Sequence, residues 1–267
     1  MRSLLLALIL LVPFSAFAQD AKPATPTLFL IGDSTVRNGQ GKGDGDLWGW
    51  GDVIGQYFDS SKITVKNRAL GGRSSRTFIT EGRWDTVLAD VKPGDYVLMQ
   101  FGHNDGGPLD GPKGRASIHG VSDETKEITT TATATSPAHP EVVHSYGWYI
   151  KKYITDTKAK GAVPIVLSPI PRNMWKEGRV NRADADYNKW ANECAEATGV
   201  QFINLNNIIA DHYDKIGEAK VGADYFTKTD HTHTSKVGAG FNAQCVIEGI
   251  QALKDSPLTG FVLEKKP

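Results

Sequence analysis

The stretch Phe29-Leu30-Ile31-Gly32-Asp33-Ser34-Thr35-Val36 decides the fold, because an apolar run ends abruptly there at Gly-Asp-Ser. A short apolar run of this kind is typical of a buried strand, and the Gly and Asp that follow are turn-forming residues. Ser34 is therefore expected at the carboxyl edge of a sheet, which is where open α/β sheets place their ligand sites. The alternative is an ordinary strand that ends in a turn, with Ser34 capping the next segment.

Four further apolar runs also end in polar or turn-forming residues. They lie at 63–65, 96–101, 163–167 and 200–203. Helix-length segments between the runs lie at 48–58, 86–91, 146–160, 182–197 and 235–253. Ser235 is the expected N-cap of the last of these helices. Strands that alternate with helices predict a parallel sheet with helices on both faces.

Residues 105–143 depart from this alternation, because they show no helical stripe and are rich in Gly, Pro and Thr. The run Thr129–Thr135 alternates in a way that could form a small hairpin. A loop of this length is unusual in a compact domain and is often functional. We expect it to be a lid or a substrate-binding excursion over the edge that carries Ser34, with a solvated loop as the alternative.

The N-terminus resembles a secretory signal over residues 1–18, with Arg2, a short apolar core and Ala16-Phe17-Ala18 as a cleavage pattern. The apolar core is too short for a membrane span. The remaining 19–267 are about 250 residues, which one α/β domain can fill. Without Arg2 the chain has 29 basic residues (30 − 1) against 30 acidic ones, a net charge of −1. This balance argues against nucleic acid as a partner, and nothing indicates an oligomer, so a monomer is expected.

The two cysteines, Cys194 and Cys245, leave a disulfide open after export. The alternative is two buried free thiols. Cys194 shares a helical face with Tyr187, Trp190 and Ala191, which favours burial.

The segment Thr229-Asp230-His231-Thr232-His233 supplies possible partners for Ser34. A serine nucleophile needs an imidazole to take its proton and a carboxylate to fix the imidazole tautomer. Asp230 and His233 are three residues apart, so one turn of chain can bring them together. A zinc-like cluster of Asp230, His231 and His233, with His103 as a further ligand, is an alternative, as are a capping Asp and a plain turn.

Donors for an oxyanion hole are available at two other strand ends. Gly72 lacks a side chain, so its backbone N–H can approach a substrate oxygen, and Asn104 carries a side-chain amide. Ser34 would add its own N–H. Gly-Gly and Asn-Asp are also common turn residues. Together with Asp230 and His233, however, four segments would bring polar groups to one sheet edge.

These four blocks resemble the signature blocks of the SGNH (GDSL-type) hydrolases and occur in that family's order. The finer pattern is similar to the rhamnogalacturonan acetylesterases: Gly32-Asp33-Ser34-Thr35, Ala69 to Arg76, Gly102-His103-Asn104-Asp105 and Asp230-His231-Thr232-His233-Thr234. The resemblance implies a flavodoxin-like three-layer sandwich with five parallel strands and no metal or organic cofactor.

The resemblance also implies roles for individual residues. Ser34 would be the nucleophile, His233 the base and Asp230 its orienting carboxylate, with an oxyanion hole made of Ser34, Gly72 and Asn104. The implied activity is deacetylation of a pectic polysaccharide that contains galacturonic acid. Residues 106–143 match the family least well.

Substrate contacts are expected from side chains in the loops at the same edge. Arg is suited to hold the carboxylate of a galacturonate, whereas a structural ion pair is the alternative. Trp side chains could stack on sugar faces or pack in the core. His103 could shape the pocket or be a half-buried, hydrogen-bonded histidine. The candidates are Arg73, Arg76, His103, Arg172, Trp48, Trp50 and Trp175.

The sequence leaves three functions open. The first is a secreted pectin acetylesterase that works through an acyl-enzyme. The second keeps the fold but changes the substrate, as a deacetylase of xylan, another glycan or a small ester, or as a lipase-like thioesterase. The third is a carbohydrate-binding module without catalysis, which would bind polysaccharide equally well without the Ser34 hydroxyl.

Overall fold

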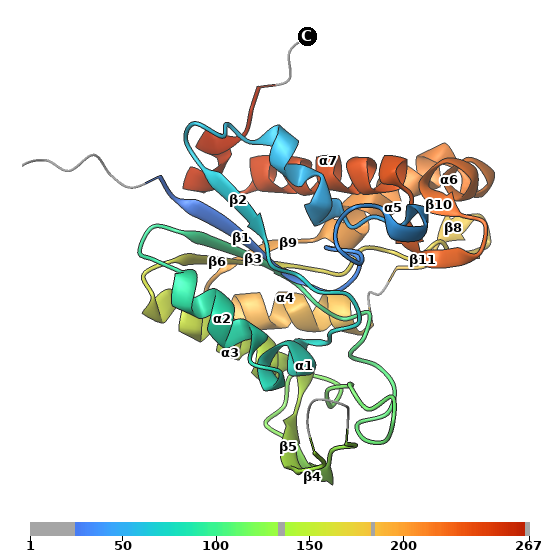
Figure 1. Cartoon of the computed structure of the whole chain (residues 1–267). Helices are drawn as coiled ribbons and strands as arrows, with labels where there is room; N and C mark the ends of the chain where they lie inside the picture. The colour runs from blue at the N-terminus through green and yellow to red at the C-terminus, as the bar shows by residue number, and fades with distance from the viewer. Residues whose placement is uncertain (1–24, 133–136, 183–184, 265–267) are drawn as a thin grey trace, which may run out of the picture.

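The computed structural model describes residues 25–132, 137–182 and 185–264. Five parallel strands form the central sheet in the order β2-β1-β3-β6-β9 (Figure 1). The strands are β1 (Thr27–Gly32), β2 (Thr64–Asn67), β3 (Tyr96–Gln100), β6 (Val163–Leu167) and β9 (Gln201–Ile203). Each coincides with one of the apolar runs, so the predicted parallel sheet is confirmed. The strand order is that of flavodoxin-like folds, in which the connections switch direction beside the first strand.

Helices cover both faces of the sheet, as predicted (Figure 1). One face carries α1 (Ser75–Thr80), α2 (Arg83–Asp90), α3 (Tyr146–Ala159) and α4 (Tyr187–Thr198). The other face carries α5 (Leu205–Ile216), α6 (Glu218–Tyr225) and α7 (Lys236–Ala252). The Ser235 hydroxyl accepts a hydrogen bond from the Gly238 N–H at 3.2 Å and so caps α7.

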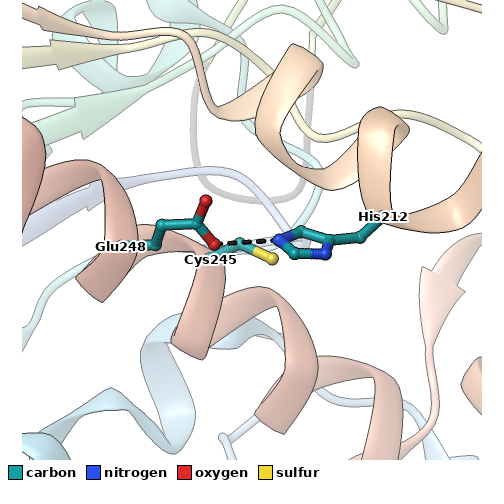
Figure 2. A group of neighbouring side chains, drawn as sticks. All are labelled: His212, Cys245 and Glu248. Carbon is teal, nitrogen blue, oxygen red and sulfur yellow. Dashed lines mark hydrogen bonds and ion pairs between the residues drawn. The ribbon is translucent and has the colours of Figure 1, made fainter. Parts of the chain in front are cut away.

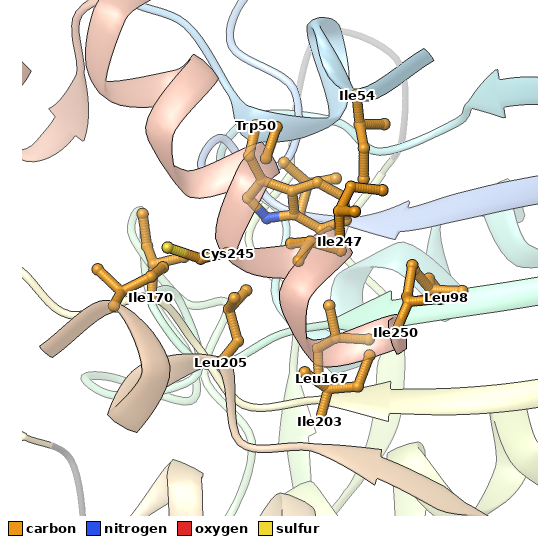
Figure 3. Packing of buried hydrophobic residues seen from close by; sticks show 14 of the residues in the cluster. Trp50, Ile54, Leu98, Leu167, Ile170, Ile203, Leu205, Cys245, Ile247 and Ile250 are labelled. Carbon is orange, nitrogen blue, oxygen red and sulfur yellow. The ribbon is translucent and has the colours of Figure 1, made fainter. Parts of the chain in front are cut away.

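Two hydrophobic clusters fill the space between the sheet and its helices. Leu28 and Leu30 of β1 pack into the cluster on the α5 and α7 side, and Phe29 and Ile31 pack into the cluster on the other side. Figure 3 shows part of the first cluster, in which Trp50, Leu98 and Ile250 pack together. Burial of one large apolar side chain contributes about 1.5–3 kcal/mol, so this alternation fixes the register of β1.

The prediction of a single helix at 48–58 is wrong. Two short 3₁₀ helices, Trp50–Asp52 and Ile54–Tyr57, take its place. The chain here lies directly on the turn after β1, because a Cβ atom at Gly49 would lie 2.3 Å from the Val36 carbonyl carbon. Helices α1, α5 and α6 were not predicted.

The excursion after β3 is folded in part. Strands β4 (Thr125–Thr129) and β5 (Pro140–His144) form an antiparallel hairpin that projects beyond α1 (Figure 1). This hairpin begins before the predicted run Thr129–Thr135, whose residues 133–135 lie outside the described residues. Its proposed role as a lid stays a prediction.

The two cysteines are free and buried on opposite faces of the sheet, so they form no disulfide. Cys245 lies beside His212 and Glu248, and His212 Nε2 lies 2.9 Å from Glu248 Oε2 (Figure 2). Burial, with the Glu248 charge nearby, raises the pKa of the Cys245 thiol to about 12. The thiol is therefore protonated at neutral pH and serves as a core side chain.

The predicted signal, residues 1–18, lies outside the described residues. Within the part of the chain that the structure describes, none of the helices combines the length and the hydropathy that a bilayer crossing requires.

Candidate active site

Ser34 lies in a tight turn at the carboxyl end of β1. The N–H groups of Val36 and Arg37 both donate to the Asp33 carbonyl oxygen, at 3.1 and 3.0 Å. Gly32 is required just before the turn, because a Cβ atom there would lie 2.5 Å from the Gln100 carbonyl oxygen. The turn leaves Ser34 half-buried between two fully buried neighbours, so its hydroxyl is the group that the turn presents.

The Asp33 carboxylate holds this turn from below. Its Oδ1 accepts the Thr35 N–H at 2.8 Å and the Thr35 hydroxyl at 2.7 Å, while its Oδ2 lies 3.3 Å from His103 Nδ1. Burial alone would raise the pKa of Asp33, but the His103 charge and the hydrogen bonds from His103 and Thr35 outweigh it and lower the pKa. The Asp33 carboxylate therefore stabilises the conformation of the turn that carries Ser34.

His103 lies between two strand ends. Its Nε2 lies 3.0 Å from the Ile170 carbonyl oxygen and its side chain is 6% exposed. Both ring nitrogens thus face oxygen atoms that act only as hydrogen-bond acceptors, namely a carbonyl oxygen and the ionised Asp33 carboxylate. His103 joins the turn after β1 to the segment after β6. It also lines the pocket described below.

Trp50 is not available to stack on a sugar, which corrects the prediction. Its side chain is 1% exposed, and its indole N–H donates to Gln100 Oε1 at 3.0 Å. The Gln100 amide in turn donates to the Thr35 hydroxyl at 2.6 Å. Trp50 therefore supports the Ser34 turn through Gln100, a polar residue at the end of an apolar strand that the sequence analysis overlooked.

Strand β11 (Asp230–Thr234) brings Asp230 and His233 to Ser34. His233 Nδ1 lies 2.6 Å from Asp230 Oδ2, and His233 Nε2 lies 2.8 Å from Ser34 Oγ. Asp230 Oδ1 also accepts the backbone N–H groups of Thr232 and His233, at 2.7 and 2.9 Å. Burial alone would raise the pKa of Asp230. The hydrogen bonds from His233 and Thr232, together with the His233 charge, outweigh burial, so the pKa of Asp230 is lowered.

This geometry fixes the protons along the array. An ionised carboxylate only accepts, so His233 Nδ1 donates to Asp230, and Nε2 is left to accept from the Ser34 hydroxyl. Such an array can remove the hydroxyl proton as the oxygen attacks a carbonyl carbon. A short hairpin of β10 (Phe226–Thr227) and β11 supports the array, and it is anchored to the nucleophile segment by a hydrogen bond from the Trp48 N–H to the Thr234 carbonyl oxygen, at 2.9 Å.

The predicted oxyanion donors come together around Ser34. A Cβ atom at Gly71 would lie 3.5 Å from the Ser34 Cβ, which places the Gly71-Gly72 turn beside the serine. Gly72 has a φ of 79°, in the left-handed region that favours glycine. The N–H groups of Ser34 and Gly72 have no acceptor among the described residues. Asn104 Nδ2 uses one hydrogen on the Arg73 carbonyl oxygen, at 3.1 Å, and keeps the other.

Asp105 ties the segment after β3 to the start of α1. Its carboxylate is fully buried and accepts the Ser75 N–H at 3.1 Å and the Ser117 hydroxyl at 3.0 Å, as well as the Ser75 hydroxyl. Burial raises the pKa of Asp105 to about 6, although the hydrogen bonds from Ser75 and Ser117 act in the opposite direction. The carboxyl group therefore changes charge in the mildly acidic range.

Asp105 should make the stability pH-dependent, and Asp105→Asn should remove this component. Between the unfolded pKa near 3.8 and the folded pKa of about 6, the folded chain binds more protons, so its stability falls as pH rises. The effect is on the order of 3 kcal/mol at most. Urea unfolding measures the free energy of unfolding of both proteins at pH 4.5 and pH 7. Relative to the wild type, Asp105→Asn should be more stable at pH 7 than it is at pH 4.5. A difference between them that stays constant with pH would contradict this assignment.

Arg76 is structural, which corrects its prediction as a substrate ligand. Its side chain is 3% exposed and pairs with Glu141 at 2.6 Å. It also donates to the carbonyl oxygens of Leu109 and Ala116, both at 2.8 Å. Arg76 thus ties the excursion after β3 to α1, and a buried charge with these partners is not free for a ligand.

The other predicted substrate residues differ in their placement. Arg73 pairs with Glu81 at 2.9 Å, so its guanidinium is directed to α1. Trp175 is half-buried against the core, and its indole N–H donates to Asn173 at 2.7 Å. Trp48 lies under the Lys236 ammonium, 5.1 Å from the ring centre. Arg172 lies beside the array, because its guanidinium donates to the Thr232 hydroxyl at 2.6 Å.

A pocket of about 610 Å³ opens at the carboxyl ends of β3 and β6, next to Arg172. Its wall includes Gly102, His103, Ile170, Arg172, Tyr187 and Asn206. From this set, the sequence analysis expected substrate contacts only of His103 and Arg172. Tyr187 was assigned to the buried face of its helix, although the pattern of that face could equally have placed the ring against a pocket.

The zinc-like alternative is not formed. Within the described residues, the group whose ligand atoms lie within 4.8 Å of one another is His212 of α5 with Cys245 and Glu248 of α7 (Figure 2). Asp230 and His233 are joined to each other instead, and His231 is exposed.

The five-stranded parallel sheet and the Ser34–His233–Asp230 array at its carboxyl edge are those of an ester hydrolase of the three-layer α/β class. Residues 30–238 match the GDSL-like Lipase/Acylhydrolase family, and the chain belongs to this family, the SGNH hydrolases. It is therefore a carboxylic ester hydrolase, as predicted.

Two relatives are similar over nearly their whole length. A rhamnogalacturonan acetylesterase of Emericella nidulans is 32% identical over 250 residues, which cover 94% of this chain and 91% of the relative. A probable rhamnogalacturonan acetylesterase of Bacillus subtilis is 32% identical over 243 residues, which cover 90% and 98%.

Solved structures show the same fold. The Bacillus subtilis protein YxiM superposes with a TM-score of 0.67 at 25% identity, over 85% of this chain and 56% of that longer chain. The acetylxylan esterase Axe2 of Geobacillus stearothermophilus superposes with a TM-score of 0.55 at 18% identity, over 86% and 95%.

Proposed function

We propose that this protein is a secreted serine esterase that removes acetyl groups from rhamnogalacturonan through an acyl-enzyme. The observation that carries the proposal is His233, which reaches Ser34 at 2.8 Å with one ring nitrogen and Asp230 at 2.6 Å with the other. The substrate class is supported by the two acetylesterase relatives, each 32% identical.

The first half of the reaction transfers the acetyl group to the enzyme. Ser34 Oγ attacks the acetyl carbonyl carbon while its proton passes to His233 Nε2. The carbonyl oxygen becomes an oxyanion, which the N–H groups of Ser34, Gly72 and Asn104 stabilise. The bond from the carbonyl carbon to the sugar oxygen then breaks, and His233 gives its proton to that oxygen, so the sugar leaves as an alcohol.

The second half returns the enzyme to its starting state. A water molecule gives a proton to His233 Nε2 as its oxygen attacks the acetyl-serine carbonyl. The new oxyanion occupies the same three donors. The bond to Ser34 Oγ breaks, Oγ regains its proton from His233, and acetate is released. Asp230 keeps its negative charge throughout and stabilises the imidazolium that forms twice in each cycle.

Replacing Asn104 by Ala should lower kcat about 10²- to 10³-fold, because one oxyanion donor is lost in the transition state. KM should change much less, since the ground-state carbonyl binds this donor weakly. Steady-state kinetics on 4-nitrophenyl acetate check this. Asn192→Ala is the matched control, because the partner of the Asn192 amide among the described residues is Glu196, on the same helix α4. A loss below threefold in Asn104→Ala would remove Asn104 from the oxyanion hole.

The substrate is tested by acetate release from a panel of acetylated rhamnogalacturonan, acetylated xylan and long-chain esters. The proposal expects the highest kcat/KM on rhamnogalacturonan. Release from xylan alone would keep the mechanism and change the substrate class. Polysaccharide binding without release of acetate from any ester would identify a binding module instead.

Export is the remaining part of the proposal. It rests on the N-terminal pattern of Arg2, an apolar core and Ala16-Phe17-Ala18. Expression of the full chain in a bacterial host, followed by N-terminal sequencing, should give a protein that begins at Gln19 outside the cytoplasm. A cytoplasmic product that keeps its first residues would contradict export.

A further inference from the structure

A histidine, a cysteine and a glutamate from two helices lie together outside the active site. Cys245 and Glu248 are three residues apart on α7 and share one face of that helix, while His212 comes from α5. Figure 2 shows the Cys245 sulfur next to the contact between Glu248 and His212. Among the described residues, none of the three bonds to the serine, histidine or aspartate of the active site, so acetyl transfer gives this cluster no role.

The ligand atoms of the cluster have separations that suit one tetrahedral metal ion. His212 Nε2 lies 2.9 Å from Glu248 Oε2. A ring nitrogen of His212, the Cys245 sulfur and a carboxylate oxygen of Glu248 all lie within 4.8 Å of one another. In a tetrahedral zinc site with bonds of about 2.0–2.3 Å, neighbouring ligand atoms lie about 3.3–3.6 Å apart. Rotation of the side chains, without movement of the backbone, therefore suffices to bring all three ligands to one ion.

The cluster is open to solvent on one side and closed by the core on the other. The His212 and Glu248 side chains are 38% and 57% exposed, whereas Cys245 is 2% exposed. Cys245 lies in the apolar cluster that also contains Ile170 and Leu205 (Figure 3). An ion can therefore enter from solvent, and the apolar floor strengthens its attraction to the ligands because the local dielectric constant is low.

The two helices are held in register beside the cluster. The Tyr213 hydroxyl of α5 donates to Asn242 Oδ1 of α7 at 3.2 Å, and both side chains are buried. The His212 ring contacts the Phe241 ring of α7 edge-on, with ring centres 5.7 Å apart. The ligands therefore keep their spacing in the metal-free protein, so that binding requires little reorganisation.

The two free thiols differ in their hydrogen bonds. Cys194 Sγ donates to the Gly147 carbonyl oxygen at 3.7 Å. Among the described residues, Cys245 Sγ has no such acceptor, and it lies beside His212 and Glu248 instead. In the metal-free protein Cys245 is a protonated core side chain, but its sulfur is available as a ligand, whereas the sulfur of Cys194 is not.

We propose that His212, Cys245 and Glu248 bind one Zn²⁺ ion, or a transition-metal ion of similar preference, and thereby link α5 to α7. Water completes the tetrahedron. Thiolate and imidazole ligands favour zinc over Mg²⁺ and Ca²⁺, which take oxygen ligands. On binding, the Cys245 S–H bond breaks, the proton passes to solvent and the sulfur electron pair binds the metal, so no oxidant or reductant is needed. This structural site goes beyond the proposed esterase function and is independent of it.

Titration of the untagged, chelator-treated protein with Co²⁺ tests the ligand set by absorption. One equivalent should produce the visible bands of tetrahedral Co²⁺ and a near-ultraviolet band of charge transfer from thiolate to Co²⁺, and Zn²⁺ should remove both. Cys245→Ser should lose the near-ultraviolet band. Cys194→Ser is the matched control and should keep it. Saturation with Co²⁺ without a near-ultraviolet band, or a band that Cys245→Ser retains, would overturn the site.

His212→Gln and Glu248→Gln test the site without a change in the core, because both side chains reach solvent. Each should weaken Zn²⁺ binding, measured by calorimetric titration, on the order of 100-fold, since one of few ligands is lost. Glu193→Gln is the matched control, because Glu193 pairs with Lys189 on α4. Equal affinities of the wild type and both site variants would overturn the proposal.

Thermal unfolding gives a readout that does not depend on esterase activity. Zn²⁺ at 100 times its Kd should raise the unfolding midpoint of the wild type by roughly 5–10 °C, whereas Mg²⁺ and Ca²⁺ at that concentration should not raise it. Ser34→Ala should show the same shift with Zn²⁺, so failure of the esterase proposal and failure of the metal site are distinguishable. A midpoint that Zn²⁺ leaves unchanged, or a shift that His212→Gln retains in full, would overturn the site.

Discussion

Replacing Ser34 by Ala should reduce acetate release on the order of 10⁶-fold. The Ser34 hydroxyl is the group that His233 Nε2 contacts at 2.8 Å, and the variant has no other oxygen at this point. The remaining rate should come from the oxyanion donors and substrate binding alone. Activity is measured by acetate release and by hydrolysis of 4-nitrophenyl acetate, with enzyme concentrations raised to detect the residual rate.

Ser61→Ala is the matched control, because in the part of the chain that the structure describes the Ser61 hydroxyl bonds only Asp59, in an exposed turn. The Ser34→Ala protein should also keep its unfolding midpoint, since the hydroxyl makes a single hydrogen bond within the described residues. Retention of more than one-tenth of the wild-type rate would exclude Ser34 as the nucleophile.

Replacing Asp230 by Asn should lower kcat about 10⁴-fold while leaving the segment folded. The Asn Oδ1 can still accept the N–H groups of Thr232 and His233, which now donate to Asp230 at 2.7 and 2.9 Å. Its amide nitrogen, however, then faces His233 Nδ1. A donor at that position forces the His233 proton onto Nε2, and Nε2 can no longer accept a proton from Ser34.

The tautomer argument has its own readout. Nitrogen NMR of the imidazole should show the proton on Nδ1 in the wild type and on Nε2 in Asp230→Asn. A loss of less than tenfold in kcat, or an unchanged tautomer, would mean that Asp230 does not orient His233.

The sequence was informative wherever a residue type and its chain position carry the information. Apolar runs that end in polar residues predicted all five strands of the sheet, because burial on both faces requires such runs. The Asp230–His233 spacing predicted a contact that one turn of chain can make by itself. Gly72 and Asn104 followed from the rule that parallel strands end at one edge.

The incorrect predictions share a physical cause, since each depended on a contact between distant segments. Trp50 and Arg76 follow strands that end at the functional edge, so the sequence placed both in exposed loops there. The structure buries Trp50 because Gln100 accepts its N–H, and it buries Arg76 because Glu141 and two carbonyl oxygens compensate the charge. Neither set of partners can be deduced from local spacing.

The pocket was missed for a related reason. Its wall combines Gly102 after β3, Ile170 after β6 and Tyr187 at the start of α4, which come together only in the folded chain. Arg172 was predicted from its chemistry, but the absence of a carboxylate partner among the described residues became visible only in the structure. Arg172 differs in this respect from Arg76, whose guanidinium pairs with Glu141.

Transfer of an acetyl group to Ser34 is the step on which the mechanism depends, and peptide mass spectrometry tests it most directly. The enzyme is mixed with 4-nitrophenyl acetate, quenched with acid before the first turnover ends and digested. We predict one additional acetyl group on the peptide that contains Ser34, and none on that peptide in Ser34→Ala. Turnover at the wild-type rate with an unmodified Ser34 peptide at every quench time would contradict the acyl-enzyme mechanism.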